Sequence, residues 1–442
     1  MEAEYFKFIL SLGLVLIFAR IFGELTSRYL KQPAVLGELV AGIIISPFLL
    51  GGLVFHDSII LNFATVHNPF GLEGEFDIMY VIANIAVVIL LFQAGVETDI
   101  RSFIRQVPTG FAVAFGGVVL PFIGGYFITR ALSPGAGTGG WLFMGAVLTA
   151  TSIGVTVRIL MDMGKLNTRE GTTILVAAVV DDIIGLIILS VVISAPRTGG
   201  VGVLEAVKIG AIGFAVWFAL LGIGVRFHKY ISRFLLGPFK NSGTAPIVAL
   251  IVGFLVAYLV TLVGLHPVVG AYVAGLMFSA CGEKEEIMEK GRPIMLFAAP
   301  FFFAYLGMMV DLRLFGAPGV AVLAVLLIVV AIIGKLVGCY IPARLGSKLS
   351  HNGGMIVGVG MIPRAEVGLI VAAAGYVSGA ITLGLYGAAV AVCVVTTLVT
   401  PSLLKPFFRK QSAPGVDCRL KKGLSIEGVT SVVTKLTATA AP

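Results

Sequence analysis

Two adjacent carboxylates, Asp181 and Asp182, lie in the middle of the apolar stretch 173–192. That stretch is long enough to cross a bilayer, and an acid at the centre of a membrane helix costs about 2.5–3.5 kcal/mol to insert. Such acids normally face a partner or a water-filled cavity, and they mark ion or proton pathways. The plainer interpretation is a structural pair of carboxylates, hydrogen-bonded inside a helix bundle. We favour the first interpretation and predict that this pair binds a transported proton or cation.

A single lysine, Lys335, lies within another apolar stretch, 329–340. A buried ammonium group needs a counter-ion, and the candidate acids at membrane depth are Asp181, Asp182 and Glu366. The alternative is that the Lys335 side chain extends to the membrane interface. Because the apolar stretch continues beyond the lysine, we predict a buried Lys335 that pairs with one of these acids.

Two apolar stretches, 145–157 and 358–370, have features of interrupted helices. The first contains Thr151 and Ser152, and the second contains Pro363, which removes a helical hydrogen bond and strains the preceding turn. Backbone groups freed at such breaks can coordinate an ion, so Thr151 and Ser152 are candidate ion ligands. Ordinary tolerance of glycine and proline in a packed membrane helix is the competing interpretation.

Charged residues flank the second break. Arg364 and Glu366 follow Pro363 directly, and they can either pair with each other or satisfy the freed backbone groups. Arg158, near the end of the other interrupted stretch, is grouped with them. We predict that these three residues stabilise or gate the site and are not themselves the cation ligands.

The composition is that of a membrane protein. Of the 442 residues, 58% are hydrophobic and 12% are charged, whereas a soluble chain carries roughly 25% charged residues. The net charge of +8 does not indicate nucleic-acid binding, because the basic residues fall in short loops between apolar runs. Neither the four cysteines nor the five scattered histidines form a metal-site or catalytic pattern. The sequence therefore predicts no cofactor and no enzyme activity.

Apolar windows of about 20 residues predict an all-α, polytopic membrane protein with about thirteen transmembrane helices. The windows are 5–21, 34–54, 78–96, 107–130, 141–160, 172–195, 205–226, 244–264, 267–281, 294–311, 318–342, 354–377 and 382–404.

Lysine and arginine residues orient these windows. One alternate set of connections holds seventeen of them, whereas the other set together with the N-terminus holds four. The positive-inside rule then predicts an outside N-terminus and a cytoplasmic C-terminus in the cell's inner membrane.

The two interrupted windows are seven apart in chain order, so they cross the membrane in opposite directions. This is the relation expected of an inverted-topology repeat, in which paired broken helices mark the binding site. The window with the two aspartates follows the first break, and the window with Lys335 precedes the second. Chain order alone therefore predicts that Asp181, Asp182 and Lys335 lie beside two crossed broken helices.

The residues resemble the second monovalent cation:proton antiporter family, the bacterial NapA-type sodium/proton exchangers. The matching segments follow one another in order through nearly the whole membrane part. They are 32–42 (QPAVLGELVAG), 90–97 (LLFQAGVE), 149–154 (TATSIG), 180–182 (VDD), 334–335 (GK) and 361–369 (MIPRAEVGL).

The resemblance implies a thirteen-helix fold with a core domain that moves like an elevator against a homodimeric scaffold in the lipid membrane. On this basis residues 97–204 and 313–404 form the core domain, and 1–96 and 231–312 form the dimerisation domain. The segment 205–230 is then a linker helix and 405–442 a cytoplasmic tail.

The resemblance also implies the transported ions. It makes Asp182 the carrier of Na⁺ or H⁺, pairs Asp181 with Lys335, and predicts electrogenic exchange of protons for sodium or lithium. Met361 and Ile362 depart from the small residues common in relatives, which leaves cation selectivity open. The alternatives are a potassium/proton antiporter or a gated potassium efflux system. A passive cation channel is disfavoured by the broken helices and the buried lysine.

Overall fold

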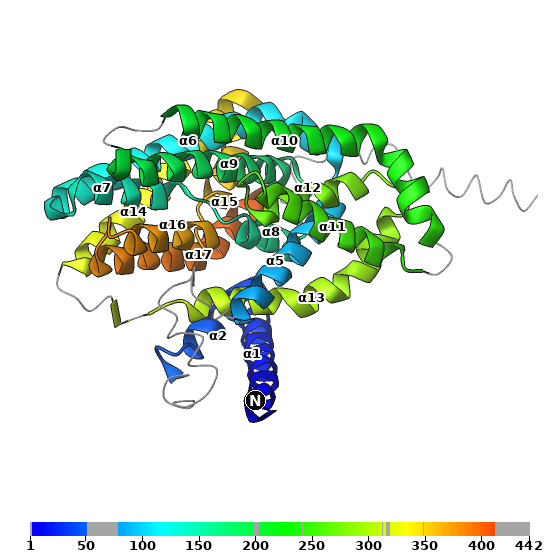
Figure 1. Cartoon of the computed structure of the whole chain (residues 1–442), viewed down its shortest axis with the longest axis horizontal. Coiled ribbons are helices and arrows are strands. Elements are labelled where there is room, and N and C mark those ends of the chain that lie inside the picture. The colour runs from blue at the N-terminus through cyan, green and yellow to red at the C-terminus, as the bar shows by residue number, and fades with distance from the viewer. Residues whose placement is uncertain are drawn as a thin grey trace, which may run out of the picture.

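The computed structural model describes residues 2–50, 78–198, 203–239, 243–311, 313–314, 319–347 and 349–411 (Figure 1). All secondary structure in these ranges is helical, and each predicted window overlaps one helix or one broken pair of helices. The main helices are α1 (Glu2–Arg28), α2 (Ala34–Ile44), α5 (Ile78–Glu97), α6 (Ile100–Leu132), α7 (Gly137–Thr149), α8 (Ile153–Asp162), α9 (Arg169–Thr198), α10 (Val203–Tyr230), α11 (Ala245–Thr261), α12 (Pro267–Phe278), α13 (Lys284–Met308), α14 (Val320–Ser347), α15 (His351–Gly360), α16 (Glu366–Val377) and α17 (Leu383–Gln411).

The chain is a multi-pass membrane protein. Within the described ranges, eight helical segments are long and apolar enough to cross a bilayer, or nine if a bent pair around α10 counts as one span. The helices α2, α11, α12 and α16 are apolar but shorter. The total of about thirteen spans stays a prediction, because length and composition alone do not assign these shorter helices to full crossings.

Several helices differ in length from the hydropathy windows. The helix α6 begins at Ile100, where the Asp99 side chain caps it by accepting from the backbone N–H groups of Arg101 and Ser102. The helix α17 continues to Gln411, beyond the apolar window. The windows stop where the residues become polar, whereas backbone hydrogen bonding continues into the interface, so hydropathy underestimates these helices.

The helices pack in two groups. The first contains α6, α7, α9 and α14–α17, and the second contains α1, α2, α5 and α11–α13, while α10 packs against both α9 and α12. Figure 1 shows α7, α14, α16 and α17 on one side of the molecule, with α11 and α13 on the other.

Glycines allow close approach within each group. A Cβ atom on Gly116 of α6 would lie 2.1 Å from the Gly338 carbonyl oxygen of α14, and one on Gly42 of α2 would lie 2.0 Å from the Ala304 carbonyl oxygen of α13. Small residues at such points let membrane helices approach backbone to backbone. Each group is therefore tightly packed internally, and the broken helices lie where α8 reaches from the first group towards the second.

Candidate ion-binding site

The first break separates α7 from α8 at residues 150–152. Ala150 and Ser152 have extended backbone angles, and the Ser152 hydroxyl caps α8 by accepting from the Val155 N–H at 3.2 Å. A serine at this position satisfies one of the free donors at the start of a helix. The predicted interruption is therefore present, and Ser152 has a local structural role in it.

The second break separates α15 from α16 at residues 361–365, and it crosses the first. The Ser152 backbone N–H donates to the Pro363 carbonyl at 2.8 Å, and the Thr151 hydroxyl donates to the Met361 carbonyl at 3.4 Å. One turn along α8, the Thr156 hydroxyl donates to the Gly360 carbonyl at 3.1 Å. Each break thus supplies partners for the polar backbone groups that the other exposes, which removes the cost of burying them unpaired.

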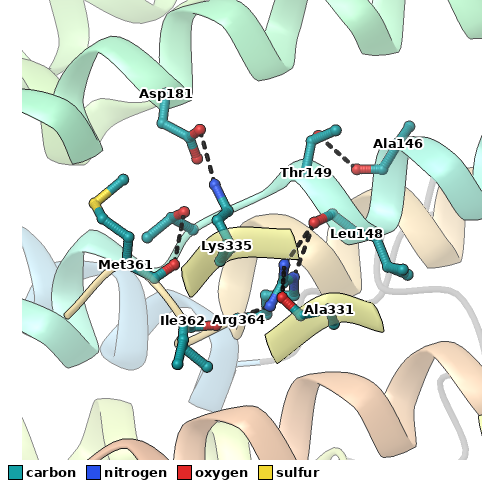
Figure 2. A network of polar contacts seen from close by, with 10 residues as sticks. Ala146, Leu148, Thr149, Asp181, Ala331, Lys335, Met361, Ile362 and Arg364 are labelled. Carbon is teal, nitrogen blue, oxygen red and sulfur yellow. Dashed lines mark hydrogen bonds and ion pairs between the residues drawn. The ribbon is translucent and has the colours of Figure 1, made fainter. Parts of the chain in front are cut away.

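The Arg364 guanidinium lies at the C-terminal ends of two half-helices (Figure 2). It donates to the carbonyl oxygens of Leu148 at 2.7 Å and Ile362 at 2.9 Å, and to that of Ala331 at 3.2 Å. The Leu148 and Ile362 carbonyls carry the partial negative charge of the ends of α7 and α15, whereas Ala331 lies in the middle of α14. The sequence left open whether Arg364 pairs with Glu366 or satisfies backbone groups freed at the breaks. Its contacts with Leu148 and Ile362 are of the second kind.

Glu366 lies at the opposite ends of the half-helices. Its carboxylate accepts from the Ser152 hydroxyl at 2.5 Å and from the Gly154 N–H, in the first turn of α8, at 3.4 Å. Glu366 is also the first residue of α16, so its charge faces the positive N-terminal ends of both α8 and α16. The crossing therefore places a cation at two helix C-termini and an anion at two helix N-termini.

The predicted ion pair between Lys335 and Asp181 is present. The Lys335 ammonium lies 3.0 Å from the Asp181 carboxylate, and the two side chains are 0% and 1% exposed (Figure 2). The alternative in which Lys335 extends to the interface is therefore wrong. The pair joins α14 to α9 within the first helix group.

Asp182 is the buried carboxylate beside this pair. It is 4% exposed, and neither of its carboxylate oxygens accepts a hydrogen bond from the described part of the chain. The charged groups that act on it electrostatically are Glu366, Asp181 and Lys335. A buried carboxylate without internal donors is suited to hold a proton or a small cation, because either one neutralises a charge that is costly to bury.

The structure gives Arg158 different partners from those expected. Its guanidinium lies 3.4 Å from the Glu38 carboxylate of α2 and 2.9 Å from that of Asp162, one turn further along α8. Arg158 therefore belongs to a separate cluster, in which Arg158 and Glu38 are buried and Asp162 is 21% exposed, and it does not join Arg364 and Glu366 in these contacts. Glu38 is 1% exposed, so it is a fourth buried acid besides Asp181, Asp182 and Glu366. The sequence did contain a signal for Glu38, because it is a lone acid within the apolar window 34–54.

Two cavities lie between the helix groups. A cleft of about 970 Å³ opens beside the end of α8 and the starts of α2 and α13, and its lining includes Asp162, Lys165 and Arg292. A much smaller pocket of about 40 Å³ is lined by Glu366, Leu369 and His266. The positive-inside rule predicts that the cleft faces the cytoplasm and the pocket the outer side.

These features define a class of protein. Crossed broken helices, a buried ion pair and a buried carboxylate without internal donors, all within a multi-pass helical bundle, are typical of secondary transporters. The chain belongs to the sodium/hydrogen exchanger family, because the family model described as "Sodium/hydrogen exchanger, transmembrane" matches residues 13–410.

Similar proteins cover nearly the same length. The chain is 34% identical to the Na(+)/H(+)-K(+) antiporter GerN of Bacillus cereus over 404 residues, which is 91% of this chain and 97% of that protein. It is 33% identical to the high-affinity Na(+)/H(+) antiporter NhaS3 of Synechocystis over 435 residues, 92% of this chain and 91% of that protein.

Among solved structures, the fold is similar to that of the sodium proton antiporter MjNhaP1 from Methanocaldococcus jannaschii. Two structures of that protein match with TM-scores of 0.57 and 0.60, at 17% and 16% identity. Both matches cover 92% of this chain, and they cover 97% and 98% of the other. The similarity supports the antiporter fold predicted from the broken helices.

Proposed function

We propose that this protein exchanges protons for sodium across the membrane, with Asp182 as the group for which the two ions compete. The observation that carries the proposal is the buried Asp182 carboxylate, which has no hydrogen-bond donor in the described chain and lies beside the Asp181–Lys335 pair. Thr151 and Ser152, at the crossing of the breaks, are proposed to contribute oxygen ligands to the sodium ion.

Coupling follows from the cost of moving charge. An empty, ionised Asp182 is expensive to carry past a hydrophobic barrier, whereas the same site neutralised by Na⁺ or H⁺ is cheaper to move. Only the site that carries Na⁺ or H⁺ then crosses the membrane readily. Each inward passage with one ion therefore requires an outward passage with the other, which couples the two flows. The pair formed by Asp181 and Lys335 is proposed to release a second proton, through one residue or the other, which makes the exchange electrogenic.

The proposed movement is of the elevator type. Residues 97–204 and 313–404 form the moving core, and 1–96 and 231–312 form a scaffold that pairs with a second copy in the inner membrane. Supporting this division, the first helix group contains the crossing, Asp182 and Lys335, while the cleft and the outer pocket both lie between the two groups. The N-terminus is then outside and the C-terminus cytoplasmic.

Potassium is the second candidate cation. The name of the Bacillus cereus relative includes both Na⁺ and K⁺, and Met361 and Ile362 border the crossing where the family resemblance implies small residues. A gated potassium pathway without proton exchange is the further alternative.

The test is proton movement in proteoliposomes that contain a pH-sensitive dye. With a pH gradient imposed and the membrane potential clamped to zero, we expect Na⁺ or Li⁺ to dissipate the gradient in wild-type vesicles. Vesicles with Asp182→Asn are the matched control and should not respond. Cation flux without proton movement would instead indicate a passive channel, and dissipation by K⁺ alone would indicate a potassium antiporter. The electrogenic part fails if an imposed potential leaves the exchange rate unchanged.

A further inference from the structure

We infer that Glu38, Arg158 and Asp162 form an ionic ladder between α2 and α8 that fixes the register of the two helix groups and favours the cleft-open arrangement. This inference rests on the proposed alternation between cleft-open and pocket-open forms. In this inference Glu38 and Arg158 position the two helix groups during transport, and they do not contact the transported ion.

The ladder has two rungs on antiparallel half-helices. In the rung nearer the crossing, Arg158 lies 3.4 Å from Glu38, and these side chains are 3% and 1% exposed. In the second rung, one turn closer to the cleft, the Asp162 carboxylate accepts from the backbone N–H groups of Ala34 and Val35, the first residues of α2. Arg158 and Asp162 are themselves 2.9 Å apart, so the rungs form one connected unit.

The two sides of the ladder are held by different helix groups, although α8 itself contacts both. The helix α2 is held by the scaffold, because Cβ atoms on Gly37 and Gly42 would lie 2.1 Å and 2.0 Å from the carbonyl oxygens of Phe22 in α1 and Ala304 in α13. The helix α8 is held by the crossing, through the hydrogen bonds of Ser152 and Thr156 to the second break. A movement of one group against the other must therefore displace α8 along α2.

Only one register satisfies the charges. A helix rises 1.5 Å per residue, so moving α8 outward by four residues (about 6 Å) brings Asp162 level with Glu38 and Arg158 level with Gly42. That separates Glu38 from the guanidinium and places the Glu38 carboxylate beside that of Asp162. Arg158 keeps only Asp162, on its own helix, because the stretch 39–45 (LVAGIII) of α2 contains no acid. A shift in the other direction brings Arg158 to the positive N-terminal end of α2. Each displacement replaces favourable contacts by repulsion or by an unpaired buried charge.

The consequence is a bias in the conformational equilibrium. The cleft of about 970 Å³ is lined by Asp162 and Ala34, so the ladder borders the cavity that is open in this structure. Contacts that exist in one conformation and not in the other shift the equilibrium by their difference in free energy. Removing the ladder should therefore populate the form in which the cleft closes and the outer pocket widens.

The experiment measures the minor, pocket-open form directly. Leu369 lines the outer pocket and is 5% exposed, so a Leu369→Cys reporter, in a chain with Cys418→Ser, should react slowly with a membrane-impermeant maleimide added to the outside. The reaction rate is proportional to the population of the open pocket. The parent chain without the reporter gives the background of the buried cysteines Cys281, Cys339 and Cys393.

We expect Glu38→Gln and Arg158→Gln each to raise the reporter's reaction rate by about fivefold or more, the lower end of typical coupling between two conformations. The double variant, Glu38→Gln with Arg158→Gln, leaves no lone buried charge and should fold, which a thermal melt would verify. It should show the same rise. Arg158→Lys keeps the positive charge, so the reporter in this variant should react at a rate near that of the wild type.

The matched control is Glu286→Gln. Glu286 and Lys290 form an ion pair of 2.8 Å within the single helix α13, so its loss leaves the register unaffected and the reaction rate unchanged. An unchanged rate in the folded double variant would overturn the ladder proposal, even with sodium/proton exchange intact in the wild type. Loss of exchange in the wild type would overturn the proposed function instead, and the labelling result would still report on the two conformations.

Discussion

Two buried ion pairs of similar geometry have different positions in the architecture. Lys335 and Asp181 join α14 and α9 inside one helix group at 3.0 Å, while Arg158 and Glu38 join α8 and α2 across the two groups at 3.4 Å. In the proposed movement of one group against the other, a pair within a group persists, whereas a pair across the boundary must break. The first pair is therefore suited to preserve and tune the site, and the second to select a conformation.

The largest expected effect is on Asp182, the buried carboxylate that belongs to neither pair. Asp182→Asn should abolish cation-dependent proton flux, because an amide cannot exchange a proton for a cation. The variant should insert and fold, since it removes a charge that is costly in the membrane. Flux in proteoliposomes measures the outcome, with protein yield and monodispersity as the folding control. Wild-type exchange by this variant would show that another group carries the ion.

The next effect concerns the pair inside the core group. Lys335→Ala should lower the free energy of unfolding by about 3–5 kcal/mol, because it leaves the Asp181 charge buried without its partner. Thermal unfolding in detergent gives the direction and relative size of the change. Asp181→Asn combined with Lys335→Gln should recover much of the loss, since neither buried charge remains. Additivity of the two single changes in a double-mutant cycle would contradict the pairing.

A smaller effect is expected at the crossing. Arg364→Gln removes a guanidinium that holds the carbonyls of Leu148, Ile362 and Ala331, and a hydrogen bond to a charged group contributes about 1.5–3 kcal/mol. We expect a lower unfolding temperature together with a reduced maximal rate. The control is Glu366→Gln, which keeps an acceptor for Ser152 and should retain measurable cation binding. If Glu366→Gln removed cation binding while stability stayed unchanged, Glu366 would be a cation ligand.

The smallest effect is expected from removing an exposed ion pair, which serves as a baseline for the two buried pairs. Glu286 and Lys290 are 30% and 52% exposed, and they lie four residues apart on α13. Exposed pairs of this kind contribute about 0–1 kcal/mol, so Glu286→Gln should change neither the unfolding temperature nor the exchange rate appreciably. If Glu286→Gln lowered the unfolding temperature as much as Lys335→Ala does, burial would not be what distinguishes the ion pairs of this protein.

The sequence predicted the architecture more fully than it predicted the contacts. The windows, both breaks and a buried Lys335 follow from the residues, whereas the choice of Asp181 as its partner follows from the family resemblance. Glu38 was missed because a single acid in an apolar window also fits a helix that begins at the interface. The sequence groups Arg158 with Arg364 because each arginine follows an interrupted apolar stretch. In the structure, however, Arg158 pairs with Glu38 of α2.

What the sequence by itself determined are the properties that depend on local composition. A long run of apolar residues predicts a membrane helix, and a carboxylate at its centre indicates a partner or an ion pathway. Proline alone does not determine a break, because Pro108 and Pro121 lie inside the continuous helix α6. The tertiary structure decided which of several possible partners Arg158 and Arg364 have. Arg158 and Glu38 are 120 residues apart in the chain, and Arg364 and Leu148 are 216 apart. Such pairings depend on how helices pack in three dimensions, and the residues along either helix do not encode that packing locally.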